Sequence, residues 1–361
     1  MFVRSSLLVL ILFAMPVSRA AARDPAAGRH VVEGDRVSIE NIAGELKVVP
    51  GTGTSVVVEV TPGGPDGDRL SVSETSREGR RVLRVEYPDD RIVYPHDGPG
   101  EGRGWSNSTF DYGGHRVRVS SRGPGLEAHA DLVVSVPRGK NVSLFLAIGP
   151  ASIEGVEGNL AFEGASSGVA IERVSGALRV QTGSGGIDVT RTHGTMSLST
   201  GSGNIEIVEA DGTIAAEAGS GGIRLRVGGD RLSAEAGSGA IVGSEIQFAE
   251  LSAECGSGHV DLADAAADRL SVETGSGSVR LQLKRGIGAL DIQAGSGSVR
   301  LEAPRDLSAT FHIECPRRQL HLDFPADVER ADDDVTVGRI GGGRGRIRIE
   351  AGSGRVELVR M

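Results

Sequence analysis

The chain has 361 residues, a formal net charge of −9 and 54 glycines. Aromatic residues make up only 3% of it, so the core must be built from small aliphatic side chains and depend strongly on backbone hydrogen bonds. Nucleic-acid-binding proteins usually carry a basic patch, so the negative net charge of this chain argues against a nucleic-acid partner.

Residues 1–22 have the pattern of a secretory signal peptide. Arg4 supplies a positive charge, an apolar run extends from Ser5 to Val17, and Ser18 and Ala20 are the small residues that precede a cleavage site. A retained membrane anchor is the alternative, but the apolar run is shorter than the ~20 residues needed to span a bilayer. We therefore expect an exported chain, periplasmic or at the cell surface, with no membrane span after processing.

Residues 31–140 predict an irregular N-terminal β cap. Short apolar runs, such as Leu46–Val48 and Leu132–Val136, alternate with turns, but their spacing follows no constant period. A stack of strands needs such a cap, because an open end exposes unpaired backbone groups.

Residues 88–115 interrupt this cap with a long predicted loop that is rich in proline, glycine and aspartate. Exposed aromatic side chains are favoured anchors at interfaces, which makes this loop a candidate binding site. In the alternative, the aromatic residues fold back and plug the cap. The aromatic residues concerned are Tyr94, Trp105, Phe110 and Tyr112.

Residues 141–361 are dominated by a repeat. The tripeptide Gly-Ser-Gly occurs eight times, with gaps of 18, 18, 18, 19, 19, 20 and 57 residues, and 57 equals three periods of 19. Apolar and polar residues alternate on both sides of each copy, which is typical of half-buried strands. The copies begin at Gly183, Gly201, Gly219, Gly237, Gly256, Gly275, Gly295 and Gly352.

This repeat predicts an all-β fold, a parallel β-helix or solenoid of about twelve two-strand rungs. Each rung of 18–20 residues comprises a strand, a Gly-Ser-Gly corner, a second strand and a second turn. Degenerate corners extend the stack, and those at 316–320 and 331–335 are expected to fill the gap before Gly352. Glycine suits the corners because positive φ costs it little and because stacked backbones approach closely.

The position just before each corner holds only small residues, among them Cys255 and Cys315. The repeat places these two cysteines three rungs apart, with roughly 14 Å between their α-carbons. A disulfide needs less than about 7 Å, so we expect two free thiols.

One position earlier, four successive rungs carry an outward glutamate. These residues form an acidic stripe that is either a cation-binding or docking face or, in the alternative, an ordinary solvated surface. A calcium-binding β-roll is excluded, because Arg224 and Val242 occupy a position where that repeat needs aspartate. The stripe consists of Glu217, Glu235, Glu254 and Glu273.

The Gly-Ser-Gly strand repeats, the segment Val136-Pro-Arg-Gly139 and the exported N-terminus together resemble the bacterial "putative adhesin" domains of unknown function, which are related to autotransporter-adhesin head domains. The resemblance extends over about residues 31–361. It implies a right-handed parallel β-helix on the cell envelope, and it supplies no catalytic residues.

The sequence therefore favours a non-enzymatic, adhesin-like interaction or scaffolding module of the bacterial envelope, with an unidentified protein or glycan as partner. No cofactor or metal site is expected, since the histidines lack metal-ligand spacing. One alternative is a carbohydrate-active β-helix enzyme, although no pair of carboxylates stands out from its neighbours. Another is an accessory protein of envelope stress or signalling.

Overall fold

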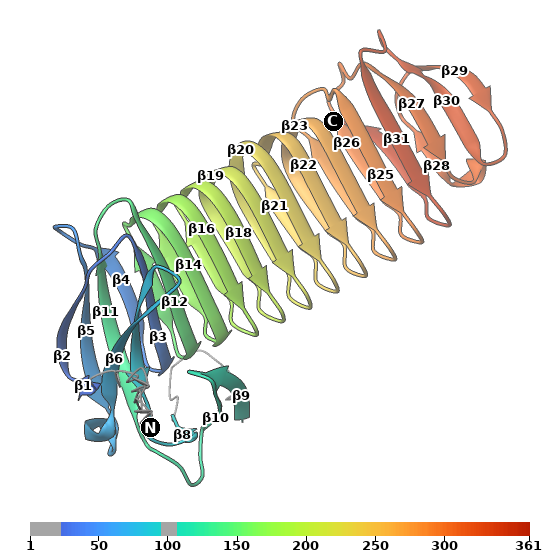
Figure 1. Ribbon diagram of the computed structural model, residues 1–361. Coiled ribbons are helices and arrows are strands. Elements are labelled where there is room, and N and C mark those ends of the chain that lie inside the picture. The colour runs from blue at the N-terminus through green and yellow to red at the C-terminus, as the bar shows by residue number, and fades with distance from the viewer. Residues whose placement is uncertain (1–22, 95–106) are drawn as a thin grey trace, which may run out of the picture.

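The computed structural model describes residues 23–94 and 107–361. Within these ranges the secondary structure is strand, apart from the single-turn 3-10 helices η1 (Gly67–Arg69) and η2 (Arg317–Gln319). The strands stack into an elongated rod with the N-terminal region at one end (Figure 1). The expectation of an all-β, solenoid-like fold is confirmed, whereas the predicted signal peptide, residues 1–22, lies outside the described residues.

Two walls of mostly parallel strands form the long sides of the rod, and we name them sheet A and sheet B. The long strands β19 (Ile205–Ala218), β20 (Ile223–Ala236) and β23 (Val260–Thr274) belong to both walls. In spatial order, the other strands of sheet A are β1 (Arg23–Pro25), β6 (Ser71–Arg77), β7 (Arg80–Glu86), β3 (Arg36–Ala43), β12 (Lys140–Ile148), β14 (Glu157–Ser166), β16 (Ser175–Thr182), β18 (His193–Thr200), β22 (Gln247–Cys255), β25 (Ala289–Ala294), β31 (Gly345–Ala351), β27 (Ala309–Glu314), β30 (Val335–Ile340) and β29 (Ala326–Ala331).

The other strands of sheet B are, in the same direction, β2 (Gly28–Val32), β5 (Val56–Gly63), β11 (His129–Val136), β4 (Leu46–Pro50), β13 (Ala151–Glu154), β15 (Val169–Glu172), β17 (Ile187–Thr190), β21 (Ile241–Ser244), β24 (Val279–Leu283), β26 (Val299–Ala303), β32 (Val356–Arg360) and β28 (Leu320–Leu322). A separate three-stranded sheet, the satellite sheet, contains β8 (Arg91–Val93), β10 (His115–Ser120) and β9 (Asn107–Tyr112).

The core lies between the two walls and follows from the alternation of side chains along each strand. In β18, Met196 and Leu198 point inward and are 1% exposed, while Ser197 between them faces solvent. The same register repeats from rung to rung, so Leu178, Met196 and Ile214 form one inward column. Each rung thereby buries small aliphatic side chains against its neighbours, as stacked repeats require.

The Gly-Ser-Gly corners need glycine because successive backbones nearly touch. A Cβ on Gly203 would lie 2.1 Å from the carbonyl oxygen of Gly185, on the preceding rung. Positive φ, the other expected reason, does not apply to the glycines of the Gly-Ser-Gly copies, whereas glycines of the second turn do have it, for example Gly194 with φ 130°. The corner glycines are therefore selected by close approach alone.

The parallel stack extends into the N-terminal region that the sequence assigns to a cap. Strands β3 and β4 pair in parallel with β12 and β13. The corner residue Gly149 stacks on Gly44, since a Cβ on Gly149 would lie 2.0 Å from the oxygen of Gly44. Antiparallel strands β1, β2, β5 and β6 then cover this end of the stack.

At the C-terminal end, the last rung is inserted between two earlier ones (Figure 1). Strand β31 pairs with β25 on one side and with β27 on the other, and β32 lies between β26 and β28. Gly352 consequently stacks directly on Gly295. The prediction that 316–320 and 331–335 fill this gap is wrong, because 316–320 lies beyond the inserted rung and 331–335 belongs to the antiparallel β29–β30 hairpin.

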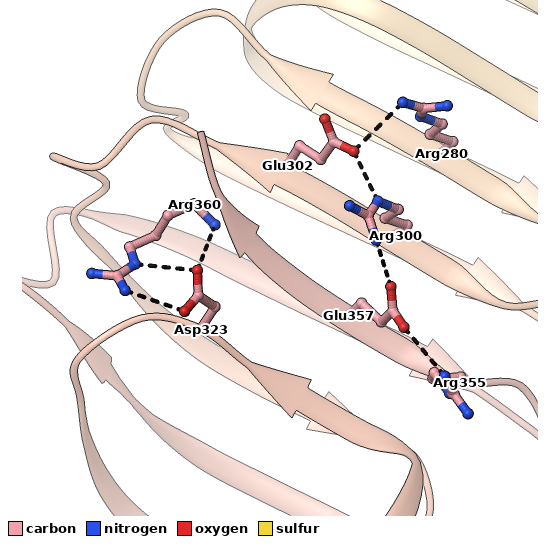
Figure 2. Close-up of polar contacts among 7 residues, drawn as sticks. All are labelled: Arg280, Arg300, Glu302, Asp323, Arg355, Glu357 and Arg360. Atoms are coloured by element: carbon pink, nitrogen blue, oxygen red, sulfur yellow. Dashed lines mark hydrogen bonds and ion pairs between the residues drawn. The ribbon is translucent and has the colours of Figure 1, made fainter.

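Ion pairs hold the inserted strand β32 on both sides (Figure 2). On the β26 side, Arg300 Nη1 lies 2.7 Å from Glu357 Oε2, and Arg300 Nε also donates to Glu302 at 2.8 Å. On the other side, Arg360 Nη2 lies 3.2 Å from Asp323 Oδ1. These partners join the final rung to the rung before it in the stack and to Asp323, directly after β28, beyond it.

Cys255 and Cys315 are free and buried. The small column runs from Cys255 through Thr274, Ala294 and Ala351 to Cys315, so four strand spacings, about 19 Å, separate the two cysteines. The expected separation of three rungs is one too few, because the insertion of β31 places Ala351 before Cys315.

Candidate interaction face

The outer face of sheet A carries three parallel columns of side chains along the rod axis. The glutamate column is the predicted acidic stripe, Glu217, Glu235, Glu254 and Glu273. The serine column consists of Ser233, Ser252 and Ser271, and the arginine column of Arg231, Glu250, Arg269, Ala289 and Arg346. Since alternate residues of a strand share one face, each rung contributes one member to each column.

The arginine column is partly neutralised within itself. Glu250 forms ion pairs with Arg231 and Arg269, its neighbours on the two adjacent rungs. Arg346 forms no ion pair with another described residue. One edge of the face therefore presents guanidinium groups with an excess of positive charge.

The glutamate column has the opposite character. Its four carboxylates are exposed, face one another on successive rungs and form no ion pair with any residue that the structure describes. Adjacent like charges at this spacing repel by about 1 kcal/mol even in bulk water. The column is thus a line of unneutralised negative charge.

Between these edges lies a groove with a volume of about 700 Å³. Its floor consists of the serine column, of Asp291 and Arg348, which continue that column, and of the edges of buried leucines such as Leu251. A second hollow of about 630 Å³ continues along the glutamate edge, past Glu273 to Gln293 and Glu350. On the rungs of β20, β22 and β23, the arrangement offers hydroxyl groups between the arginine column and the glutamate column.

The predicted aromatic site is only partly placed. Trp105 lies outside the described residues. Tyr94 and Phe110 are half-buried; Tyr94 packs against the ring of His129 at 5.2 Å, and Phe110 against that of Phe145 at 6.3 Å.

Tyr112 is buried, with only 7% of its surface exposed, so it is unavailable as an exposed anchor. Its hydroxyl group lies 2.8 Å from the carbonyl oxygen of Val85 and 2.9 Å from that of Glu40, and it can donate to either. Burial raises the pKa of Tyr112 well above its ordinary value. The residue has the position expected in the alternative, in which aromatic side chains fold back onto the cap.

Sequence reasoning missed the serine and arginine columns, although the signal was present in the repeat. Aligning the corners at Gly237, Gly256 and Gly275 also aligns the outward residues two and four positions upstream from the glutamates. The glutamate position holds the same charge in four successive repeats, which is evident in the sequence. The arginine position holds residues of mixed charge, which hides its periodicity.

Two further findings concern the described residues alone. They contain no group of three or more His, Cys, Asp or Glu side chains that could hold a metal ion. Nor do they contain a helix long and apolar enough to cross a membrane.

Comparison with known proteins finds a family model that matches the part of the chain that carries this face. Residues 212–359 match the family model described as Toastrack DUF4097, and all residues that line the groove lie within this range. A putative cell adhesion protein from Clostridium sporogenes aligns with 94% of this chain and 100% of its own, at 8% identity and a TM-score of 0.22. No curated protein matches the chain.

Proposed function

We propose that the chain is a non-enzymatic, exported interaction or scaffolding module of the adhesin-like type, built as a parallel β-helix of about twelve rungs. It binds an extended protein or glycan of the bacterial cell envelope along the groove of sheet A. The observation that carries this proposal is the register of the outward columns, which repeats a serine and a glutamate on the three successive rungs of β20, β22 and β23.

Binding along a rigid, periodic face suits an elongated partner. Backbone hydrogen bonds between rungs hold the columns in place, so little side-chain or loop ordering opposes association. The charged edges supply orientation and rate of encounter, whereas the serine floor leaves room for the chain of the partner. The match to a family of unknown function and the resemblance to adhesin-type domains are compatible with this role.

The proposal is tested by obstructing the groove. Ser252 lies on its floor, and Ser257 is an equally exposed serine at the corner of the same rung. Immobilised full-length chain should retain envelope material from the producing cells, Ser252→Trp should lose that capture, and Ser257→Trp should keep it. Equal capture by both variants, or no capture by the unmodified chain, contradicts binding in the groove.

A further inference from the structure

A smaller pocket lies near the N-terminal end of sheet A, where the satellite sheet packs on the outer face of the rod. Its volume is about 330 Å³, within the range of small-molecule sites. Small side chains of β3, β12 and β14 form its floor, namely Ser38, Ser143 and Ala161. None of its lining residues lines the groove, so the two sites are independent.

Buried contacts fix the wall of this pocket. Arg84 pairs with Glu40 at 2.6 Å, and both side chains are largely buried. The guanidinium group of Arg84 also lies over the ring of Tyr112, 5.4 Å from its centroid. Together with the hydrogen bond from the hydroxyl group of Tyr112, these contacts hold the β9–β10 turn against sheet A. The pocket is therefore preformed.

An aromatic ring stands beside the pocket floor. Phe145 points outward from β12 and is half-buried, with Tyr112 5.9 Å away between ring centroids. Along the same outward column, Glu163 is its direct neighbour on β14, and Gln181 follows on β16. The ring of Phe145 therefore offers a hydrophobic surface next to polar side chains, on a face that elsewhere presents serine and charged residues.

Four exposed charged side chains surround this ring: two acidic, Glu163 and Asp111, and two basic, Arg80 and Arg179. None of the four forms an ion pair with another described residue, in contrast to pairs such as Glu250 with Arg231 in the arginine column. The pocket thus combines unpaired hydrogen-bond acceptors and donors with one aromatic surface.

The chemistry of the lining restricts the ligand. A free phosphate would be repelled by the carboxylates of Glu163 and Asp111, and a lone cation by the two arginines. A purely apolar ligand would leave these charges desolvated without partners. A sugar residue satisfies all of them, because its hydroxyl groups both donate and accept and its C–H face packs on an aromatic ring.

We infer that this pocket binds one residue of a neutral glycan, which packs on Phe145, donates hydrogen bonds to Glu163 and Asp111, and accepts them from Arg80 and Arg179. The size of the pocket limits recognition to a single sugar unit, so the rest of the glycan extends into solvent. This site goes beyond the groove proposed above and does not depend on it.

The test is a printed array of neutral and acidic bacterial glycans probed with the full-length chain. We expect binding to a subset of the neutral glycans. Glu163→Gln should weaken binding to the best of them by about tenfold, the loss expected for one hydrogen bond to a charged group. The control is Glu217→Gln, the same change further along the same outward column, which should bind like the unmodified chain.

Three outcomes contradict the inference: no neutral glycan binds, only acidic glycans bind, or Glu217→Gln weakens binding as much as Glu163→Gln. Phe145→Leu, which keeps an apolar side chain against Phe110, should weaken binding while leaving the melting temperature nearly unchanged. Ser252→Trp, which obstructs the groove, should leave glycan binding intact. That variant separates failure of this site from failure of the groove.

Discussion

At the scale of single residues, close backbone contact is the strictest constraint on the rod. A Cβ on Gly203 would lie 2.1 Å from Gly185 O and 2.5 Å from Gly185 C, both of which are backbone atoms that cannot rotate away. We expect Gly203→Ala to lower the free energy of unfolding by about 1–3 kcal/mol, as overpacking does. Urea denaturation measures this change. Ser202→Ala, at the exposed residue of the same corner, should be nearly neutral; equal losses in both variants would contradict the close-contact explanation.

A second residue-scale constraint operates at the opposite turn, where several non-glycine residues have positive φ. Glu245 is one of them, with φ 53°, and it forms no ion pair with another described residue. This conformation costs an L-residue about 1–2 kcal/mol, more than the entropy that glycine loses on folding. Glu245→Gly should therefore stabilise the chain by up to about 1 kcal/mol. Thermal melts of the two variants measure this change. Glu245→Ala, which retains the Cβ, should give no such gain in stability.

At the scale of the element, the two charged columns of sheet A should respond oppositely to the same substitution on one strand. Glu254 of β22 lies between two other glutamates, whereas Glu250 of β22 lies between two arginines. Glu254→Lys replaces repulsion by attraction and should stabilise the chain by up to about 1 kcal/mol. Glu250→Lys should destabilise it, because both of its ion pairs are lost.

The salt dependence provides the check on this pair of variants. Exposed charges are screened by salt, so the difference in melting temperature between the two variants should shrink as ionic strength rises from 0.01 M to 1 M. A difference that persists at high salt would show that packing, rather than charge, distinguishes the two columns.

At the scale of the whole molecule, the sequence predicts what repeats and misses what departs from the repeat. The spacing of the corners is sufficient for the strand register, because a one-residue slip would reverse every inward side chain. It gave the inward columns and the glutamate column correctly. Periodicity alone could not reveal the insertion of β31, since a gap of 57 residues fits three periods as well as it fits a detour.

The pocket beside Phe145 lay beyond sequence reasoning for a related reason. It forms where the satellite sheet packs on the rod, and that contact joins Tyr112 to Glu40 and Val85, far apart along the chain. No local pattern encodes such a contact. The aromatic concentration in residues 88–115 marked the region, but it did not show which rings are buried.

The inserted rung can be tested through Cys315. In the structure, Ala351 lies directly beside Cys315, about 5 Å away between α-carbons, whereas Ala294 is two spacings away, about 10 Å. Only the first separation suits a disulfide. Under mild oxidation, Ala351→Cys should therefore form a bond to Cys315, and Ala294→Cys should not. If the rungs followed chain order, the outcome would be reversed, because Ala294 would then be the neighbour of Cys315.

Counting thiols after denaturation without reductant reads out this cross-link. The unmodified chain should give two thiols, since Cys255 and Cys315 are about 19 Å apart. Ala351→Cys should give one after oxidation, and Ala294→Cys three. Burial raises the pKa of both native thiols, so the oxidation should be run at alkaline pH, where Cys315 can react. Cys255 should stay intact because no other thiol lies within disulfide distance of it. The position of the new disulfide thus shows whether, in solution, residues 345–361 lie between the rung before them in the stack and the segment 309–322, as they do in the structure.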